Sequence, residues 1–235
     1  MTKVKPKLIF CGCLVLSLTL GMVSCSKEKP AVTIQEEFDQ LYGQIEVGGP
    51  FAGAEFHKSR PIPSRISFYY PVANSLDLST DYWARYNSQP LEITIFTEKD
   101  TFNIGRQGWA YIYGPHFVEF AKEVYSFDIK LSYRFGSDLP IMVSSLDIVG
   151  GQGAEPIQKV TMKWSLSLRT SHAYRWLTDP VLENVSTDIF AISYPDSGSA
   201  NAAMFVSNFT KSKSSWEFHP GSQPEVVFNY IPNRT

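Results

Sequence analysis

The segment Asp81-Tyr82-Trp83-Ala84-Arg85-Tyr86 combines three large aromatic rings with one acid and one base. Tyr and Trp rings can cover the C–H face of a pyranose, while their polar tips and neighbouring carboxylate and guanidinium groups bind hydroxyls. Loop-forming residues precede the segment and "NSQP" follows it, which predicts a short extended piece between two turns. The segment is therefore the first candidate for a sugar-binding surface.

Alternation along an extended piece sends Tyr82 and Trp83 to opposite faces, with Tyr86 on the face of Tyr82. We expect Trp83 to be the exposed platform, because its neighbour Ala84 offers little cover. Arg85 and Tyr86 belong to the same candidate ligand-binding set. The next candidates for that surface are two aromatic residues on one face of "GWAYIYG", Trp109 and Tyr111. The alternative for each ring is core packing, since β-sandwiches are rich in aromatic residues.

Nucleophilic and metal chemistry have little support in the sequence. The run Asp196-Ser197-Gly198-Ser199 lacks the Gly-x-Ser-x-Gly elbow of a serine hydrolase. No two of the four histidines form a short-spaced pair, and Asp77 with Asp81 would not complete a calcium cage. We therefore expect no metal site and no cofactor. The histidines are His57, His116, His172 and His219.

Paired carboxylates are the remaining catalytic option. Glycoside hydrolysis needs two acids that face each other across the scissile bond, a relation that spacing in the sequence does not reveal. The candidates lie near aromatic residues or in expected loops, and for each the alternative is a solvated surface acid. They are Glu55, Asp77, Asp81, Glu92 and Asp188.

The N-terminus predicts a lipid-anchored protein. Lys3, Lys5 and Lys7 precede an apolar run from Leu8 to Val23, so residues 1–24 are expected to form a secretory signal. The run ends at "GMVSC", which resembles the bacterial lipobox and makes Cys25 the expected acylated residue. Residues 25–32 read as a flexible tether, and their "SKE" resembles the export signal of Bacteroidota surface lipoproteins. The predicted location is the outer membrane, facing outward.

The cysteines and the charge narrow the functional classes. All three cysteines, Cys11, Cys13 and Cys25, lie in the signal or at the lipidation position, so the domain has no disulfide or thiolate chemistry. Without the signal, 18 basic residues face 23 acids, a net charge near −5. The chain has no basic block, which argues against a nucleic-acid partner.

Residues 33–235 are expected to form one all-β domain, an antiparallel two-sheet β-sandwich that could be of the large supersandwich kind. Period-two alternation is clear in "YSFDIKLSYRF" and in "VTMKWSLSL", as a strand with one buried face requires. One or two short helices are expected, at Ile34–Tyr42 and Phe117–Val124. The expected strands are Arg65–Tyr70, Leu91–Thr97, Gly108–Tyr113, Tyr125–Phe135, Ile141–Val149, Gln158–Thr170, Asp188–Ser193, Ala202–Asn208 and Pro224–Tyr230.

Three stretches carry a family resemblance: "GAEFHKSRPIPSRISFYYPVANSLDLSTDYW", "GWAYIYG" and "YSFDIKLSYRFGSDLPIMV". They resemble the N-terminal β-sandwich module that precedes the (α/α)-barrel of glycoside hydrolases in Bacteroidota. In those enzymes the catalytic acids belong to the barrel, so the resemblance carries over no catalytic residue. It implies a stand-alone sandwich or the front part of an enzyme with a helical-barrel catalytic partner.

The sequence thus predicts a lipid-anchored surface module for glycan binding or degradation, non-catalytic by itself, whose partners are a glycan or oligosaccharide and the membrane. Two alternatives stay open. One is an intact carbohydrate hydrolase whose acids come from the sandwich, and the other is a structural or adhesin-like surface lipoprotein.

Overall fold

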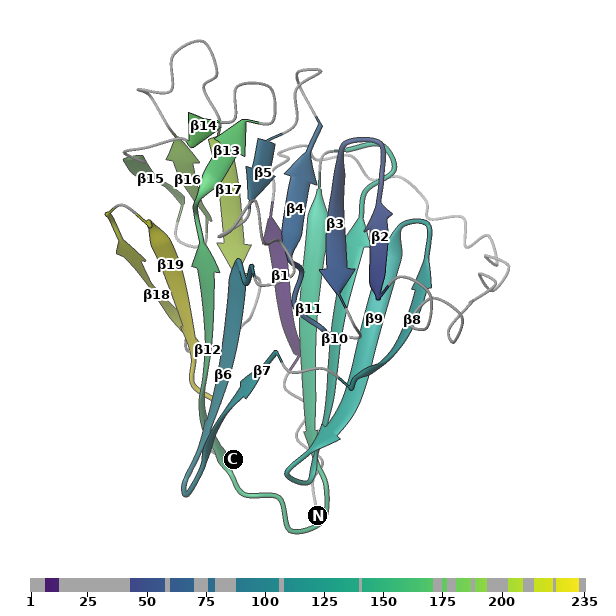
Figure 1. The fold of residues 1–235 in the computed structure, drawn as a ribbon. Helices are drawn as coiled ribbons and strands as arrows, with labels where there is room; N and C mark the ends of the chain where they lie inside the picture. Colours follow the sequence, from purple (N-terminus) through teal and green to yellow (C-terminus); the bar gives the residue numbers. More distant parts are fainter. Residues whose placement is uncertain are drawn as a thin grey trace, which may run out of the picture.

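The computed structural model describes residues 7–12, 43–57, 60–69, 76–78, 88–105, 108–139, 141–170, 175–176, 181–186, 189–193, 203–208, 214–221 and 223–232. Within these ranges the chain forms strands and no helix, and every strand pairing is antiparallel. Figure 1 shows the strands packed face to face in layers. The protein is an all-β antiparallel sandwich, as its alternating pattern predicts.

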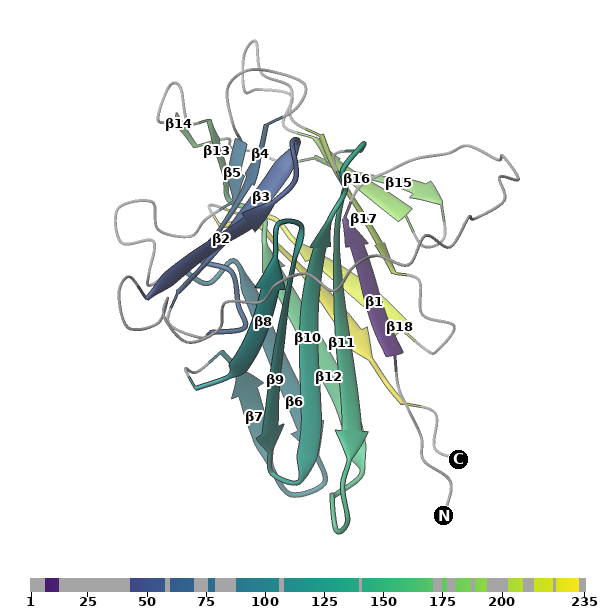
Figure 2. The ribbon, with the colours of Figure 1, turned by 90° about the vertical axis from the view of Figure 1, so that its right-hand side faces the viewer.

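The largest sheet has eight strands, and Figure 2 shows its β8, β9, β10, β11 and β1 side by side in front of the strands of a second layer. In spatial order it consists of β15 (Val181–Ser186), β16 (Ile189–Ser193), β17 (Ala203–Asn208), β1 (Lys7–Gly12), β11 (Met142–Gly150), β10 (Phe127–Phe135), β9 (Phe117–Val124) and β8 (Ala110–Gly114).

Two smaller sheets form the second layer. The five-stranded sheet has the order β18 (Ser214–His219), β19 (Glu225–Tyr230), β12 (Ile157–Ser165), β6 (Leu91–Thr97) and β7 (Thr101–Ile104). The six-stranded sheet has the order β14 (Arg175–Trp176), β13 (Leu168–Thr170), β5 (Leu76–Leu78), β4 (Arg65–Phe68), β3 (Ala52–His57) and β2 (Gln44–Gly48). The chain passes directly from β12 to β13, which connects the two sheets.

Aromatic contacts hold both smaller sheets on the large one. Phe56 of β3 lies between Phe120 of β9 and Tyr133 of β10, with ring centroids 5.3 and 5.1 Å apart. Phe102 of β7 lies 6.1 Å from Phe127 of β10. All five side chains are buried. Such pairs contribute about 0.5–1.5 kcal/mol each beyond the area that they bury.

The structure corrects several expected boundaries. The predicted strand Leu91–Thr97 is β6 itself, whereas Gln158–Thr170 divides into β12 and β13. The predicted helical turns at Phe117–Val124 are wrong, because this segment is β9 and pairs with β8 and β10 on its two sides. The expected helix at Ile34–Tyr42 lies outside the described residues.

Strand β1 comes from the expected signal segment. In the structure, Lys7–Gly12 pairs with Met142–Asp147 of β11 on one side and with Val206–Asn208 of β17 on the other. Removal of residues 1–24 stays a prediction, and it would take a strand out of the interior of this sheet.

The Tyr133 hydroxyl gives a test of how the layers are joined. It is fully buried and donates a hydrogen bond of 2.8 Å to the backbone oxygen of Pro61, and burial raises its pKa well above the ordinary value. Replacing Tyr133 by Phe leaves that carbonyl without this donor. We expect Tyr133→Phe to lower the free energy of unfolding by about 1–2 kcal/mol in urea titrations at pH 7.

The same substitution should show a pH dependence of known sign. Above the ordinary tyrosine pKa of about 10, an unfolded chain ionises Tyr133 while the folded chain does not, so the wild type loses stability as the pH rises. Tyr133→Phe lacks this loss, and the stability gap between the two proteins should narrow above that pH. A gap that widens would contradict the buried, neutral hydroxyl. Exposed Tyr125→Phe is the control and should leave the stability unchanged at both pH values.

Candidate functional site

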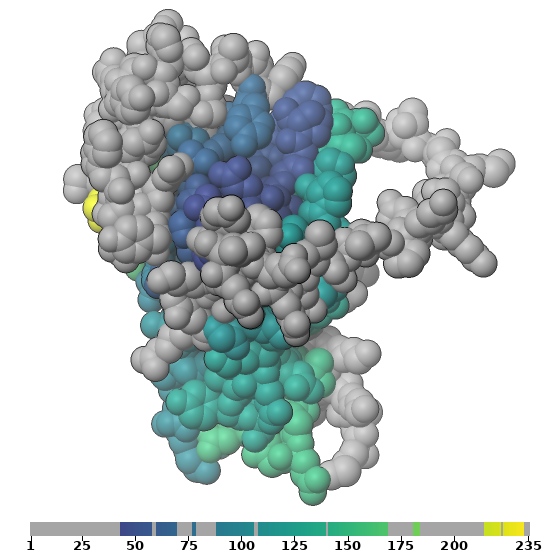
Figure 3. Space-filling model, turned by 45° about the vertical axis from the view of Figure 1, so that its right-hand side comes forward, coloured from purple at the N-terminus to yellow at the C-terminus, as the bar shows by residue number. Residues whose placement is uncertain are grey.

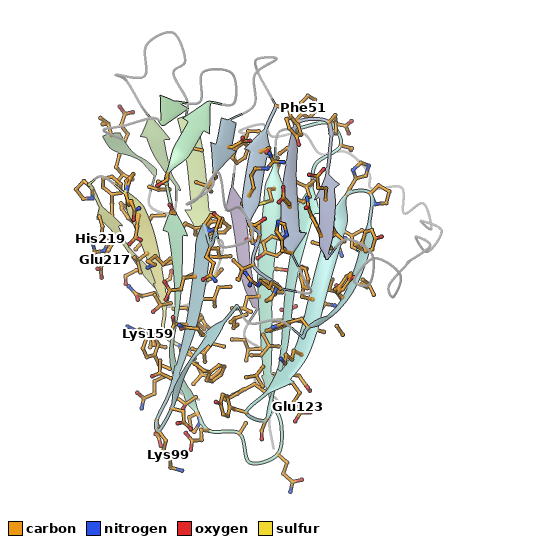
Figure 4. All side chains as sticks on the ribbon, in the orientation of Figure 1. Phe51, Lys99, Glu123, Lys159, Glu217 and His219 are labelled. Atoms are coloured by element: carbon orange, nitrogen blue, oxygen red, sulfur yellow. The ribbon has the colours of Figure 1, made fainter. Side chains whose placement is uncertain are left out.

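A cavity of about 550 Å³ opens between β7, the edge of the five-stranded sheet, and β8–β9 at the edge of the eight-stranded sheet. We call it the Trp109 pocket. Its volume lies within the roughly 300–1,000 Å³ that is usual for small-molecule sites. Figure 4 labels Glu123, one of its lining residues, near the lower end of β9. The lining residues are Thr101, Phe102, Asn103, Ile104, Gly105, Trp109, Lys122, Glu123, Val124 and Tyr125.

The pocket combines aromatic walls with polar groups. The Phe102 and Tyr125 rings are in tilted contact, with centroids 5.1 Å apart, and Trp109 is only 4% exposed. Lys122 and Glu123, which are neighbours on β9, supply a cation and a carboxylate. Apolar ring faces beside a few hydrogen-bonding groups are the usual arrangement for binding a ring that carries hydroxyls.

Tyr125 occupies an unfavourable backbone conformation. Tyr125 and Ser126 form the two-residue turn between β9 and β10, and both have positive φ angles, 48° and 64°. Turns of this kind favour Asn-Gly, because a positive φ is unfavourable for residues other than Gly, Asn and Asp. The Tyr125 side chain is nevertheless large and 68% exposed. A strained, exposed aromatic residue at the rim of a pocket points to a role for that ring beyond stability.

Of the aromatic residues that the sequence suggested for a ligand surface, the structure describes Trp109 and Tyr111. Trp109 and Tyr111 are both buried, so neither is an exposed platform. Trp109 still lines the pocket, whereas Tyr111 packs on Phe120 and Tyr113, with ring centroids 5.9 and 6.2 Å apart. Tyr111 is thus a core residue. Trp83, Arg85, Tyr86 and Cys25 lie outside the described residues.

Two of the candidate carboxylates lie on the six-stranded sheet. Glu55 of β3 and Asp77 of β5 are both buried, and both lie beside β4, which separates their strands. Asp77 accepts a hydrogen bond of 2.7 Å from Ser67. Glu92 instead forms an ion pair with Lys163 at 2.7 Å on a partly exposed face, which raises the pKa of that lysine. Asp81 and Asp188 lie outside the described residues.

Glu55 is the centre of a polar network. Its Oε1 lies 2.5 Å from Nε2 of His57, and its Oε2 lies 3.3 Å from Nη2 of Arg65. The Ser64 hydroxyl donates to the backbone oxygen of Glu55 at 3.0 Å and lies 3.4 Å from Oε1. The carboxylate therefore stands between the serine and the histidine. This order differs from a Ser-His-acid triad, in which the histidine contacts the nucleophile.

The other described histidines have local contacts. His116 Nδ1 lies 2.8 Å from the backbone oxygen of Gly48, which ties the β8–β9 turn to β2. His219 is exposed on β18, 3.6 Å from Glu217, and both are labelled at the edge of the molecule in Figure 4. Within the described ranges, no group of three or more His, Cys, Asp or Glu side chains is arranged to hold a metal ion. His172 lies outside those ranges.

Comparisons with known proteins found no matching family model, no similar curated protein and no similar solved structure. In the part of the chain that the structure describes, no helix is long and apolar enough to cross a membrane.

The strained turn predicts an unusual gain of stability. Ser126→Gly removes the strain of the left-handed conformation, which is about 1–2 kcal/mol for a residue with a side chain. Glycine also makes the unfolded chain more flexible, which lowers the free energy of unfolding by about 0.4–1 kcal/mol. We expect a net rise of roughly 0.5–1 kcal/mol in the free energy of unfolding, measured by urea titration. Ser137→Gly is the matched control, since Ser137 is exposed and has no positive φ. Equal destabilisation by both substitutions would contradict the assigned turn.

Proposed function

We propose that this protein is a lipid-anchored surface β-sandwich module that binds a glycan and is non-catalytic by itself. The observation that carries the proposal is the Trp109 pocket, with Phe102, Trp109 and Tyr125 as apolar faces and Lys122 and Glu123 as hydrogen-bonding groups. The family resemblance of the sequence to modules of glycan-degrading enzymes supports the same ligand class.

The composition of the pocket favours binding over cleavage. Hydrolysis of a glycosidic bond requires two carboxyl groups on opposite sides of that bond. The lining residues of the Trp109 pocket include one carboxylate, that of Glu123. The buried carboxylates Glu55 and Asp77 belong to a different sheet. A pocket with rings and a single acid is suited to holding a sugar, and a catalytic partner would supply both catalytic acids.

The binding experiment is a glycan array, followed by calorimetry with the best oligosaccharide. Tyr125→Ala removes the exposed ring and should weaken binding roughly tenfold, the effect of losing one aromatic anchor. Phe96→Ala is the control, because Phe96 is a ring on β6 that contacts Lys159 at 4.6 Å and lines neither this pocket nor its rim. It should leave the affinity unchanged.

Two results would redirect this proposal. Release of reducing sugar by the purified chain would favour the intact hydrolase. Binding that survives Tyr125→Ala at full strength would move the glycan site away from the Trp109 pocket, and Trp83→Ala would then test the remaining aromatic segment, with an expected loss of about 1–3 kcal/mol at an anchor.

The anchor has its own test. Cys25 stands at the end of the apolar leader, where acylation would attach the chain to a membrane. We expect Cys25→Ala to move the protein from the membrane pellet to the soluble fraction in cell fractionation, because a chain without its acyl groups has lost the anchor. Ser24→Ala, one residue away, is the control and should stay with the membranes. Cys25→Ala that remains in the pellet would refute lipid attachment.

A further inference from the structure

A second, smaller cavity of about 240 Å³ lies on the polar face of β2, β3 and β4, and we call it the Glu46 pocket. Figure 4 labels Phe51 at the turn between β2 and β3, at the upper end of the molecule, far from Glu123 of the Trp109 pocket. In Figure 3 the residues of β2–β4 reach the surface in the upper half. The lining residues are Glu46, Val47, Gly48, Gly49, Gly53, Ala54, Glu55, Arg65, Ser67 and Tyr69.

A pair of glycines lines this pocket. Gly48 of β2 lies directly opposite Gly53 of β3 in the strand register. A Cβ on Gly48 would meet the Gly53 Cα at 2.6 Å, and a Cβ on Gly53 would lie 3.1 Å from the Tyr69 hydroxyl. The two glycines therefore let the strands and the Tyr69 hydroxyl pack closely at this end of the pocket.

Polar side chains surround the two glycines. Arg65 Nη2 lies 3.5 Å from Glu46 Oε1 and 3.3 Å from Glu55 Oε2, so one guanidinium lies between two carboxylates. Ser67 is oriented by its hydrogen bond to the buried Asp77. The Tyr69 ring is exposed, and partial burial of its hydroxyl raises its pKa, with Arg65 opposing this shift. Acceptors and donors thus alternate around the cavity.

We propose that the Glu46 pocket is a second ligand site, which takes one neutral polyhydroxylated ring, the size of a single monosaccharide unit. Carboxylates paired with a guanidinium can bind neighbouring hydroxyls, as acceptor on one oxygen and donor on the next. Two carboxylates against one guanidinium disfavour an anionic ligand. Only the ligand class of this site, a sugar, rests on the proposed function. The site itself is independent of it, because the Glu46 pocket and the Trp109 pocket have different lining residues.

The experiment is an amide NMR titration of the full chain. The probes are the methyl glycosides of glucose, galactose and mannose, raised into the millimolar range that a single sugar ring requires, with glucuronic acid as the anionic comparison. We expect at least one neutral glycoside to shift the Gly48 and Gly53 amides, and glucuronic acid to leave them in place. The absence of such shifts with all three neutral probes would overturn the proposal, and so would equal binding of glucuronic acid.

Substitutions then test the assigned groups. Glu46→Gln should weaken the neutral glycoside about tenfold, the effect of losing a charge-assisted hydrogen bond. Glu217→Gln is the matched control, since Glu217 has a nearly equal exposure and also one ion pair, on β18. Gly53→Ala should displace the Tyr69 hydroxyl and weaken binding while the fold persists, because the new Cβ meets the movable end of the Tyr69 side chain. Unchanged affinity in both Glu46→Gln and Gly53→Ala would overturn the site.

The two sites can fail separately. Tyr125→Ala should leave the Gly48 and Gly53 shifts intact, because Tyr125 lines the Trp109 pocket alone. Loss of those shifts in Tyr125→Ala would mean that a single site accounts for both results, which overturns the second site. Shifts at Gly48 and Gly53 without any array binding would support the Glu46 pocket while contradicting the proposed function of the Trp109 pocket.

Discussion

The contact of Phe56 with Phe120 and Tyr133 is the interaction on which both pockets depend. Phe56 sends its ring into the core from β3, and alternation then turns Gly53 and Glu55 of the same strand to the opposite, polar face. Phe120 fixes β9, whose end carries Lys122 and Glu123 into the other pocket. One buried aromatic cluster therefore sets the position of two surfaces that face different directions.

The sequence predicted several long strands and missed shorter ones, such as β2 and β7, whose few residues give too short a pattern. β6 alternates cleanly, with Ile93 and Ile95 buried, and β10 follows the same pattern except at the buried Ser132. β3 is buried on both faces and contains a glycine and a buried acid, so no period-two pattern marks it. The "FVEFAKEV" of β9 contains good helix formers, and pairing with strands on both sides overrides that local preference.

Less of the candidate site than of the fold could be predicted from the sequence. Trp109 was identified as an aromatic candidate, but its neighbours in the pocket come from β7 and from the β9–β10 turn, and only sheet packing brings these segments together. Tyr125 was assigned to a strand face because its turn lacks the usual Asn-Gly. The Glu46 pocket is lined by residues of β2, β3 and β4, including a glycine pair across two strands, and such a pairing is visible only once the register is known.

The position of β19 has a consequence for how the chain folds. β19 is the last strand, and it pairs with β12 on one side and β18 on the other. Because a chain emerges from the ribosome N-terminus first, one edge of β12 has no partner until β19 has been synthesised. Non-local pairing of this kind gives slow folding and a long-lived open sheet edge. Until β19 pairs with it, this edge of β12 is a place where another chain could add a strand, so the order of synthesis itself creates an aggregation risk.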